Sequence, residues 1–135
     1  MIFVDTGYLV ALLDRKDQHN ARAVAWSAQV REELITTTAI VLETFNNLSD
    51  TYLRGLPHLL FDSLARPGAL TVVQIEPDLL SRGLALHRQR PDKRWSLSDC
   101  ISFTLITDRR ITRALAYDHH FEQAGFEALL RRDPP

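Results

Sequence analysis

The chain has 135 residues, of which 45% are apolar and 24% are charged, and its formal net charge is −1. This balance is typical of a globular protein and excludes a disordered chain, and the length suits one domain spanning residues 1–135. The near-zero charge excludes an overall positive field, so any contact with a nucleic acid must come from local basic clusters.

The chain carries one cysteine, Cys100. A single thiol excludes an internal disulfide and a cysteine-rich zinc site, and we expect a reducing compartment. Met1 leads directly into an apolar run, with no basic leader and no cleavage site, and no apolar run approaches the ~20 residues that span a bilayer. These features predict a cytoplasmic protein.

The first third of the chain alternates between strand and helix patterns. An apolar run predicts a strand over 1–4, and apolar residues at helical spacing predict helices over 7–13 and 19–33. The β-branched run LITTT predicts a second strand over 34–38, and a long amphipathic helix follows over 39–54.

Turn residues divide the middle of the chain. Glycine and proline start a helix over 57–65, and LTVVQI predicts a strand over 70–75. A proline starts the next helix over 77–90. A polar, basic loop follows, and Ser96 then opens a helix over 96–107.

The last elements are short. The pattern predicts a strand over 114–117, a helix over 119–124 and a last strand over 126–130. Strands that alternate with helices in this way predict an α/β fold, with a mostly parallel sheet covered by helices on both faces.

Two strand-to-helix junctions begin with an aspartate. Asp5 follows the first strand, and Asp118 follows the strand over 114–117. Aspartate is among the best helix N-caps, so capping explains either residue taken alone. However, ligands of open α/β sheets bind at the carboxyl ends of strands, and both residues lie at such ends. A ligand site is therefore the alternative to capping.

Two further acids lie on predicted helices. Asp99 follows Ser96 at capping-box spacing, in a mostly apolar first turn, and Glu43 lies inside AIVLETFNNL, where it faces either solvent or a site. Two carboxylates ~5 Å apart repel by about 3 kcal/mol. If the four acids meet, protons or a cation must neutralise them, and oxygen ligands suit Mg²⁺ or Mn²⁺.

The chain resembles the PIN-domain ribonucleases and, among them, the VapC toxins of type II toxin–antitoxin modules. The resemblance is carried by VDTGYLVALLD, TTTAIVLETFNNL, WSLSDCISF and ALAYDHHFEQAGF, which follow the family's order over nearly the whole chain. It implies a three-layer α/β/α fold and a toxin that hydrolyses RNA phosphodiesters with Mg²⁺, for which Mn²⁺ substitutes. It also implies a homodimer and a cognate antitoxin.

The resemblance also assigns site residues. The acidic positions that would hold metal and carry catalysis are Asp5, Glu43, Asp99 and Asp118. Thr6 matches a position that helps to hold the pocket. Ala116 departs from the family, because many relatives carry a threonine or serine there, and this departure puts a hydroxyl contact beside the pocket in doubt.

Basic clusters are the candidates for holding RNA. The loop HRQRPDKRW precedes Asp99, and its candidate RNA-binding residues are Arg90, Lys93 and Arg94. A second cluster, DRRITR, is better explained as a solvated surface. Trp95 either stacks on a base or packs at the helix start, and packing is the preferred interpretation. His119 and His120 are interpreted as a surface pair.

Two other α/β classes fit less well. A haloacid-dehalogenase-type phosphotransferase needs a second aspartate two residues after the first, where this chain has Gly7. A receiver domain needs an acidic pair and a late lysine, whereas the only lysines are Lys16 and Lys93. A PIN domain that binds RNA without cutting it stays open, and turnover distinguishes it from an enzyme.

Overall fold

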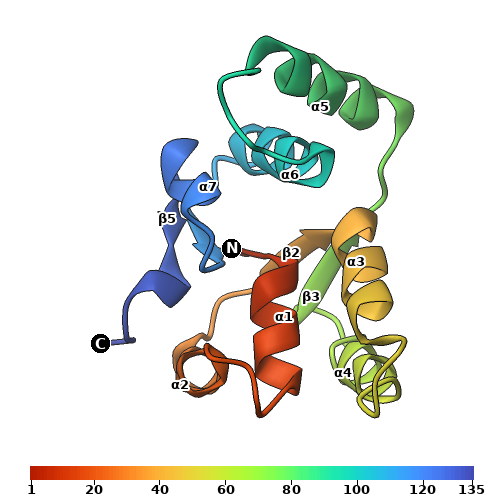
Figure 1. The fold of residues 1–135 in the computed structure, drawn as a ribbon, viewed down its shortest axis with the longest axis vertical. Coiled ribbons are helices and arrows are strands. Elements are labelled where there is room, and N and C mark those ends of the chain that lie inside the picture. The colour runs from red at the N-terminus through yellow and green to blue at the C-terminus, as the bar shows by residue number, and fades with distance from the viewer.

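The computed structural model describes residues 1–135 and has five strands in one sheet, in the order β3-β2-β1-β4-β5 (Figure 1). All neighbouring strands are parallel, which confirms the predicted sheet. The strands are β1 (Ile2–Val4), β2 (Leu34–Thr37), β3 (Leu70–Val73), β4 (Arg113–Leu115) and β5 (Glu127–Ala128).

Seven α-helices connect the strands. They are α1 (Thr6–Leu13), α2 (Asn20–Gln29), α3 (Thr38–Leu48), α4 (Leu56–Ser63), α5 (Pro77–Gln89), α6 (Leu97–Asp108) and α7 (His119–Gln123). The connections from β1 to β3 step one way along the sheet, and those to β4 and β5 step the other way. Right-handed crossovers therefore place α1 to α4 on one face and α5 to α7 on the other, as Figure 1 shows. The predicted three-layer fold is confirmed.

The core is one cluster of buried apolar side chains centred on β1 and α6. The ring of Phe121 lies 6.1 Å from that of Phe3 and 5.1 Å from that of Phe103, so aromatic contacts join β1, α6 and α7. Burying each such side chain stabilises the fold by about 1.5–3 kcal/mol. The strand that carries Asp5 at its end is thereby fixed in position.

Helix α3 ends at Leu48, six residues before the predicted end. The Ser49 hydroxyl donates to the Phe45 carbonyl at 2.6 Å, and the Thr51 hydroxyl donates to the Leu48 carbonyl at 3.0 Å. Thr51 also accepts from the Leu53 amide at 3.0 Å. These side chains satisfy backbone groups locally, which competes with helix continuation.

Other predicted boundaries also shift. Helix α2 ends at Gln29 instead of residue 33, and the Arg31 guanidinium donates to the Ala28 carbonyl at 2.8 Å in the last turn. The predicted strand over 126–130 pairs only at Glu127–Ala128, and a 3₁₀ turn at Leu129–Arg131 follows. No helix combines the length and the apolar character needed to cross a bilayer.

Candidate active site

The candidate site lies where the strand order reverses, between β1 and β4. The Asp5 amide donates to the Leu115 carbonyl at 3.1 Å, so the ends of these two strands are held together. The buried Thr36 hydroxyl donates to the Val4 carbonyl at 2.8 Å and fixes the same end of β1 to β2. Such a reversal point is where open α/β sheets bind ligands.

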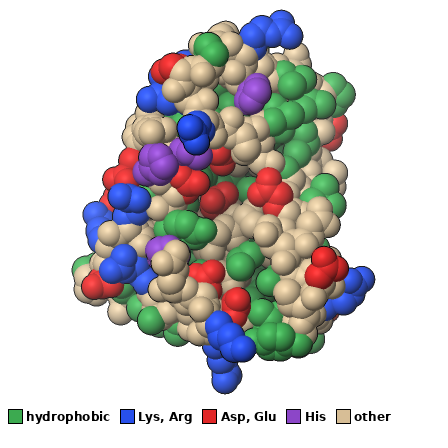
Figure 2. Space-filling model, viewed as in Figure 1, with side chains coloured by type: hydrophobic (Ala, Val, Ile, Leu, Met, Phe, Trp, Pro, Cys, Tyr) green, Lys and Arg blue, Asp and Glu red, His purple; other side chains and the backbone are tan.

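A cleft of about 380 Å³ opens at this point, and thirteen residues line it. They include all four acids that the sequence singled out: Asp5, Glu43, Asp99 and Asp118. Figure 2 shows acidic side chains gathered in a hollow near the middle of the face, with histidine and basic side chains beside them. The inference that these acids share one small volume is therefore correct.

Asp5 is the N-cap residue of α1, but its side chain makes no capping hydrogen bond. Capping therefore does not explain this carboxylate. The pKa of this carboxyl is raised from 3.8 to about 7. Burial is the largest cause, and the negative charges of Asp99, Glu43 and Asp118 contribute, against a backbone hydrogen bond from Thr6 that lowers it. The negative charge of ionised Asp5 is thus unfavourable beside the other three acids.

Glu43 faces the cleft and not bulk solvent. It lies on α3 and is partly buried, and its Oε2 accepts a hydrogen bond from the Thr6 hydroxyl at 2.7 Å. Because Thr6 follows Asp5 directly, this bond joins α3 to the end of β1. Thr6 therefore contacts the acid cluster through Glu43.

Asp99 and Asp118 combine capping with a place in the cleft. Asp99 Oδ2 accepts from the Ser96 amide at 3.0 Å, and the Ser96 hydroxyl accepts from the Asp99 amide at 3.0 Å, which completes a capping box. Asp118 Oδ1 caps α7 by accepting from the His120 amide at 3.0 Å. Burial raises the pKa of Asp99, although Ser96 and His120 both act to lower it. Asp99 and Asp118 therefore act as helix caps and also line the cleft, so both interpretations from the sequence apply to them.

His120 is a residue of the site that the sequence interpretation missed. Its side chain is 17% exposed, and its Nδ1 lies 3.2 Å from Asp99 Oδ2 and 3.4 Å from Asp118 Oδ1. His119, at 60% exposed, fits the predicted surface position better. Only the packing of α7 beside α6 brings His120 to Asp99, so spacing along the chain carried no signal of this contact.

The acids keep free oxygens toward the cleft. The hydrogen bonds described above use Glu43 Oε2, Asp99 Oδ2 and Asp118 Oδ1, and the second oxygen of each of these carboxylates makes no hydrogen bond with the protein. Three oriented carboxylates with a free oxygen each, beside the perturbed Asp5, are a donor set that fits a hard divalent cation. The residues present therefore suit Mg²⁺ or Mn²⁺.

The ring of Tyr117 forms part of the cleft wall. Tyr117 lines the cleft, and its ring stacks on that of His19 with centroids 4.1 Å apart. A Cβ at Gly7 would lie 2.5 Å from Tyr117 Cε1, which is closer than real contacts allow. Gly7 therefore makes room for the Tyr117 ring beside Asp5.

The three candidate RNA-binding residues differ in their surroundings. Arg94 lines the cleft, is exposed and forms no ion pair. Arg90 forms two hydrogen bonds with Asp92, at 2.9 and 3.0 Å, and lies over the ring of Trp95. Lys93 is partly buried and does not line the cleft. Arg94 is thus the cation that the structure brings to the acids.

Trp95 is a packing residue, as preferred from the sequence. It is 6% exposed, its Nε1 donates to Gln123 Oε1 at 3.1 Å, and its ring meets that of Phe103 edge-on. Ala116, the departure from the family pattern, is fully buried at the end of β4 and does not line the cleft.

Comparison with known proteins identifies the family. The model of the PIN domain family matches residues 2–127, which is most of the chain. The chain belongs to the PIN domain family. A curated relative, the 23S rRNA-specific endonuclease VapC20 of Mycobacterium tuberculosis, is 28% identical over 129 residues, covering 93% of this chain and 95% of the relative.

Solved structures agree on the fold. The crystal structure of M. tuberculosis VapC20, described as a sarcin-ricin loop cleaving toxin, matches with a TM-score of 0.85 and 22% identity over 93% of this chain and 96% of that one. FitAcB from Neisseria gonorrhoeae matches with a TM-score of 0.65 and 17% identity over 95% of each chain. A toxin–antitoxin complex from Klebsiella pneumoniae matches with a TM-score of 0.62, at 14% identity over 84% and 83%. The predicted family is confirmed.

Proposed function

We propose that this PIN-domain chain is a Mg²⁺-dependent endoribonuclease, that Mn²⁺ substitutes for Mg²⁺, and that the protein acts as the toxin of a toxin–antitoxin pair. The observation that carries the proposal is the convergence of Asp5, Glu43, Asp99 and Asp118 in one cleft at the reversal point of the sheet. The relative named as a 23S rRNA-specific endonuclease supports this activity and makes 23S rRNA the first defined substrate to test.

The four acids would hold the cation, with Thr6 orienting Glu43 through its 2.7 Å hydrogen bond. A divalent cation in such a site supplies an activated water and stabilises the charge that develops on the phosphate. The chain contributes the negative charge, and the bonds from Ser96 and His120 keep the Asp99 carboxylate in one orientation. No side chain in the cleft has to act as a covalent nucleophile.

Arg94 would contact the RNA backbone. It is the unpaired cation among the residues that line the cleft, and a guanidinium suits a phosphate because it offers parallel N–H donors. A near-neutral protein needs such a local contact, because its net charge of −1 does not attract a polyanion. Arg90, which is occupied by Asp92, would contribute less.

The experiment is cleavage of a mixed RNA pool, and of 23S rRNA, with Mg²⁺ or Mn²⁺ and then with EDTA. Asp99→Asn keeps an acceptor for the Ser96 amide, so the helix stays capped while the charge is lost. Asp50→Asn makes the same chemical change at an exposed position outside the cleft and is the control. We expect cutting by the wild type and Asp50→Asn alone. Cutting that persists in EDTA or in Asp99→Asn contradicts the proposal.

We also infer that the protein binds a protein antitoxin and forms a homodimer. The match to a toxin–antitoxin complex supports the antitoxin. An apolar groove between α3, α4 and β3 is lined by residues that include Val41, Leu42 and Phe45, and Leu42 is 63% exposed. Exposed apolar patches of this kind mark interaction sites. Leu42→Glu should reduce the amount of antitoxin, the product of the neighbouring gene, that co-purifies with the protein after co-expression.

Sedimentation equilibrium tests the homodimer by measuring the mass of the protein in solution. A single-chain mass at micromolar concentration contradicts the dimer.

A further inference from the structure

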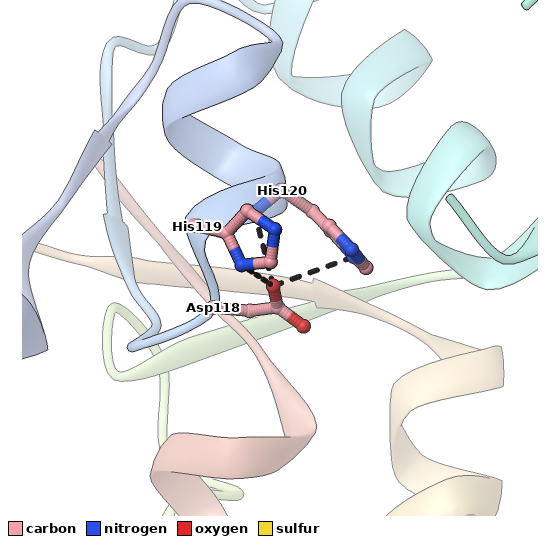
Figure 3. Close-up of side chains that lie close together, drawn as sticks. All are labelled: Asp118, His119 and His120. Carbon is pink, nitrogen blue, oxygen red and sulfur yellow. Dashed lines mark hydrogen bonds and ion pairs between the residues drawn. The ribbon is translucent and has the colours of Figure 1, made fainter. Parts of the chain in front are cut away.

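We propose that His119 and His120, together with Asp118 and Asp99, form a second cation site, selective for a transition metal such as Zn²⁺. Figure 3 shows both imidazole rings turned toward the same carboxylate oxygen of Asp118. His119 Nδ1 and His120 Nδ1 each lie 3.4 Å from Asp118 Oδ1. The ligand atoms of these three residues all lie within 4.8 Å of one another.

A fourth candidate ligand atom lies beside His120. Asp99 Oδ2 lies 3.2 Å from His120 Nδ1, on α6 opposite α7. In a tetrahedral zinc site with bonds of about 2.05 Å, neighbouring ligand atoms are about 3.3 Å apart. The three measured separations, 3.2, 3.4 and 3.4 Å, match this edge length. His120 Nδ1 is thus spaced to share an ion with Asp118 Oδ1 and with Asp99 Oδ2. The exposed His119 ring is the ligand that would rotate to complete a four-coordinate set.

The ligand types separate this site from the acidic site. Mg²⁺ prefers oxygen ligands in octahedral geometry, whereas imidazole nitrogen suits Zn²⁺ and other transition metals. His119 is 60% exposed, so an ion has direct access from solvent. The second site therefore selects a different metal although it shares Asp99 and Asp118 with the acidic site.

Sharing two carboxylates couples the sites. An ion held by Asp118 Oδ1 and Asp99 Oδ2 withdraws negative charge from the free oxygens of the same carboxylates. Zn²⁺ at this second site should therefore weaken Mg²⁺ binding and inhibit RNA cleavage. This inhibitory effect rests on the proposed function, whereas the zinc site itself does not.

The test is a calorimetric titration of the metal-free, full-length protein with ZnCl₂. His119→Ala is the main variant, because His119 is exposed and lies outside the acidic cluster, so the fold and the brace from His120 to Asp99 remain. His87→Ala removes an exposed histidine on α5 and is the control. Co²⁺ is a second probe, because a four-coordinate Co²⁺ site absorbs strongly in the visible range and a six-coordinate oxygen site does not.

We expect one Zn²⁺ per chain in the wild type and in His87→Ala. Loss of a direct ligand in His119→Ala should weaken zinc binding by more than about tenfold, since even indirect supports of metal sites are worth about 10–100-fold. The strong Co²⁺ band should disappear in the same variant. Absence of zinc binding, or equal binding by His119→Ala, overturns the site.

Cleavage assays then separate the site from the enzyme. His119→Ala should cut RNA with Mg²⁺ at the wild-type rate in zinc-free buffer, and one equivalent of Zn²⁺ should inhibit the wild type but not this variant. A protein that binds zinc through His119 but cuts no RNA supports the site and refutes the proposed function. A protein that cuts RNA but binds no zinc supports the proposed function and refutes the zinc site.

Discussion

Replacing Asp5 by Asn should stabilise the metal-free protein while abolishing its activity. The substitution removes a buried negative charge and keeps almost the same side-chain shape. In the fold, the pKa of Asp5 is about 7, against an ordinary value of 3.8. An acid whose folded-state pKa is raised leaves stability intact below its unfolded pKa, and stability is lost as the pH rises through the folded pKa. The wild type therefore loses stability between about pH 4 and pH 7.

The size of the effect follows from this difference. One pH unit corresponds to about 1.4 kcal/mol. The raised pKa of Asp5 therefore costs at most about 4 kcal/mol at pH 8, where the folded protein holds the ionised carboxylate. It costs about 1.7 kcal/mol at pH 5, where folded Asp5 is still protonated. Asp5→Asn should raise the free energy of unfolding by up to these amounts, and the gain at pH 8 should be about two to three times the gain at pH 5. Water that reaches the partly buried carboxylate lowers the folded-state pKa and with it the gain at pH 8. The gain at pH 5 depends on the unfolded-state pKa, so the gain at pH 8 stays the larger of the two.

Urea unfolding in EDTA at pH 5 and pH 8 measures this gain for the wild type, Asp5→Asn and Asp50→Asn. The control should change the free energy of unfolding by less than about 0.5 kcal/mol at either pH, because Asp50 is exposed. A gain for Asp5→Asn that is absent at pH 8, or equal at both pH values, refutes the view that Asp5 is a strained member of an acidic cluster.

Three further substitutions test the surroundings of the acids. Thr6→Val removes the hydroxyl that donates to Glu43 and should lower kcat by about tenfold to a hundredfold. Thr6→Ser keeps this hydroxyl and should retain the wild-type kcat. Equal kcat values for the two variants contradict the orienting role of Thr6. Gly7→Ala drives a Cβ into the Tyr117 ring and should cost about 1–3 kcal/mol in urea unfolding, and a neutral result would show that the ring moves freely. Arg94→Ala should reduce the salt dependence of RNA binding by about one phosphate contact in filter-binding assays, and an unchanged slope removes Arg94 from the RNA path.

Local patterns predicted the order of strands and helices, and the family resemblance assigned the four acids to one pocket, where the structure brings them together. Asp5 and Asp118 end strands, and parallel strands bring their carboxyl ends to one edge, so the position of the acids follows from the order of the elements. Asp99 satisfies its capping spacing and still faces the cleft, because Oδ2 serves the cap and Oδ1 makes no protein hydrogen bond.

Contacts between distant elements could not be predicted. His120 joins the site only because α7 packs beside α6. Arg90 is paired with Asp92, two residues along, and does not line the cleft. The end of α3 at Leu48 depends on hydroxyl groups that satisfy backbone carbonyls, a competition that apolar periodicity does not record. The sequence specified the charges of the site but not their hydrogen-bond partners.

The most direct test of the central claim compares metal binding with cleavage. Mn²⁺ bound to the protein, measured by electron paramagnetic resonance, and the rate of RNA cleavage are followed over the same range of Mn²⁺ concentrations. If the four acids hold the catalytic cation, the two curves should coincide in the wild type, and both should be lost in Asp5→Asn. Cleavage that reaches its full rate without bound Mn²⁺, or that survives in Asp5→Asn, would contradict a carboxylate-held metal at this cleft.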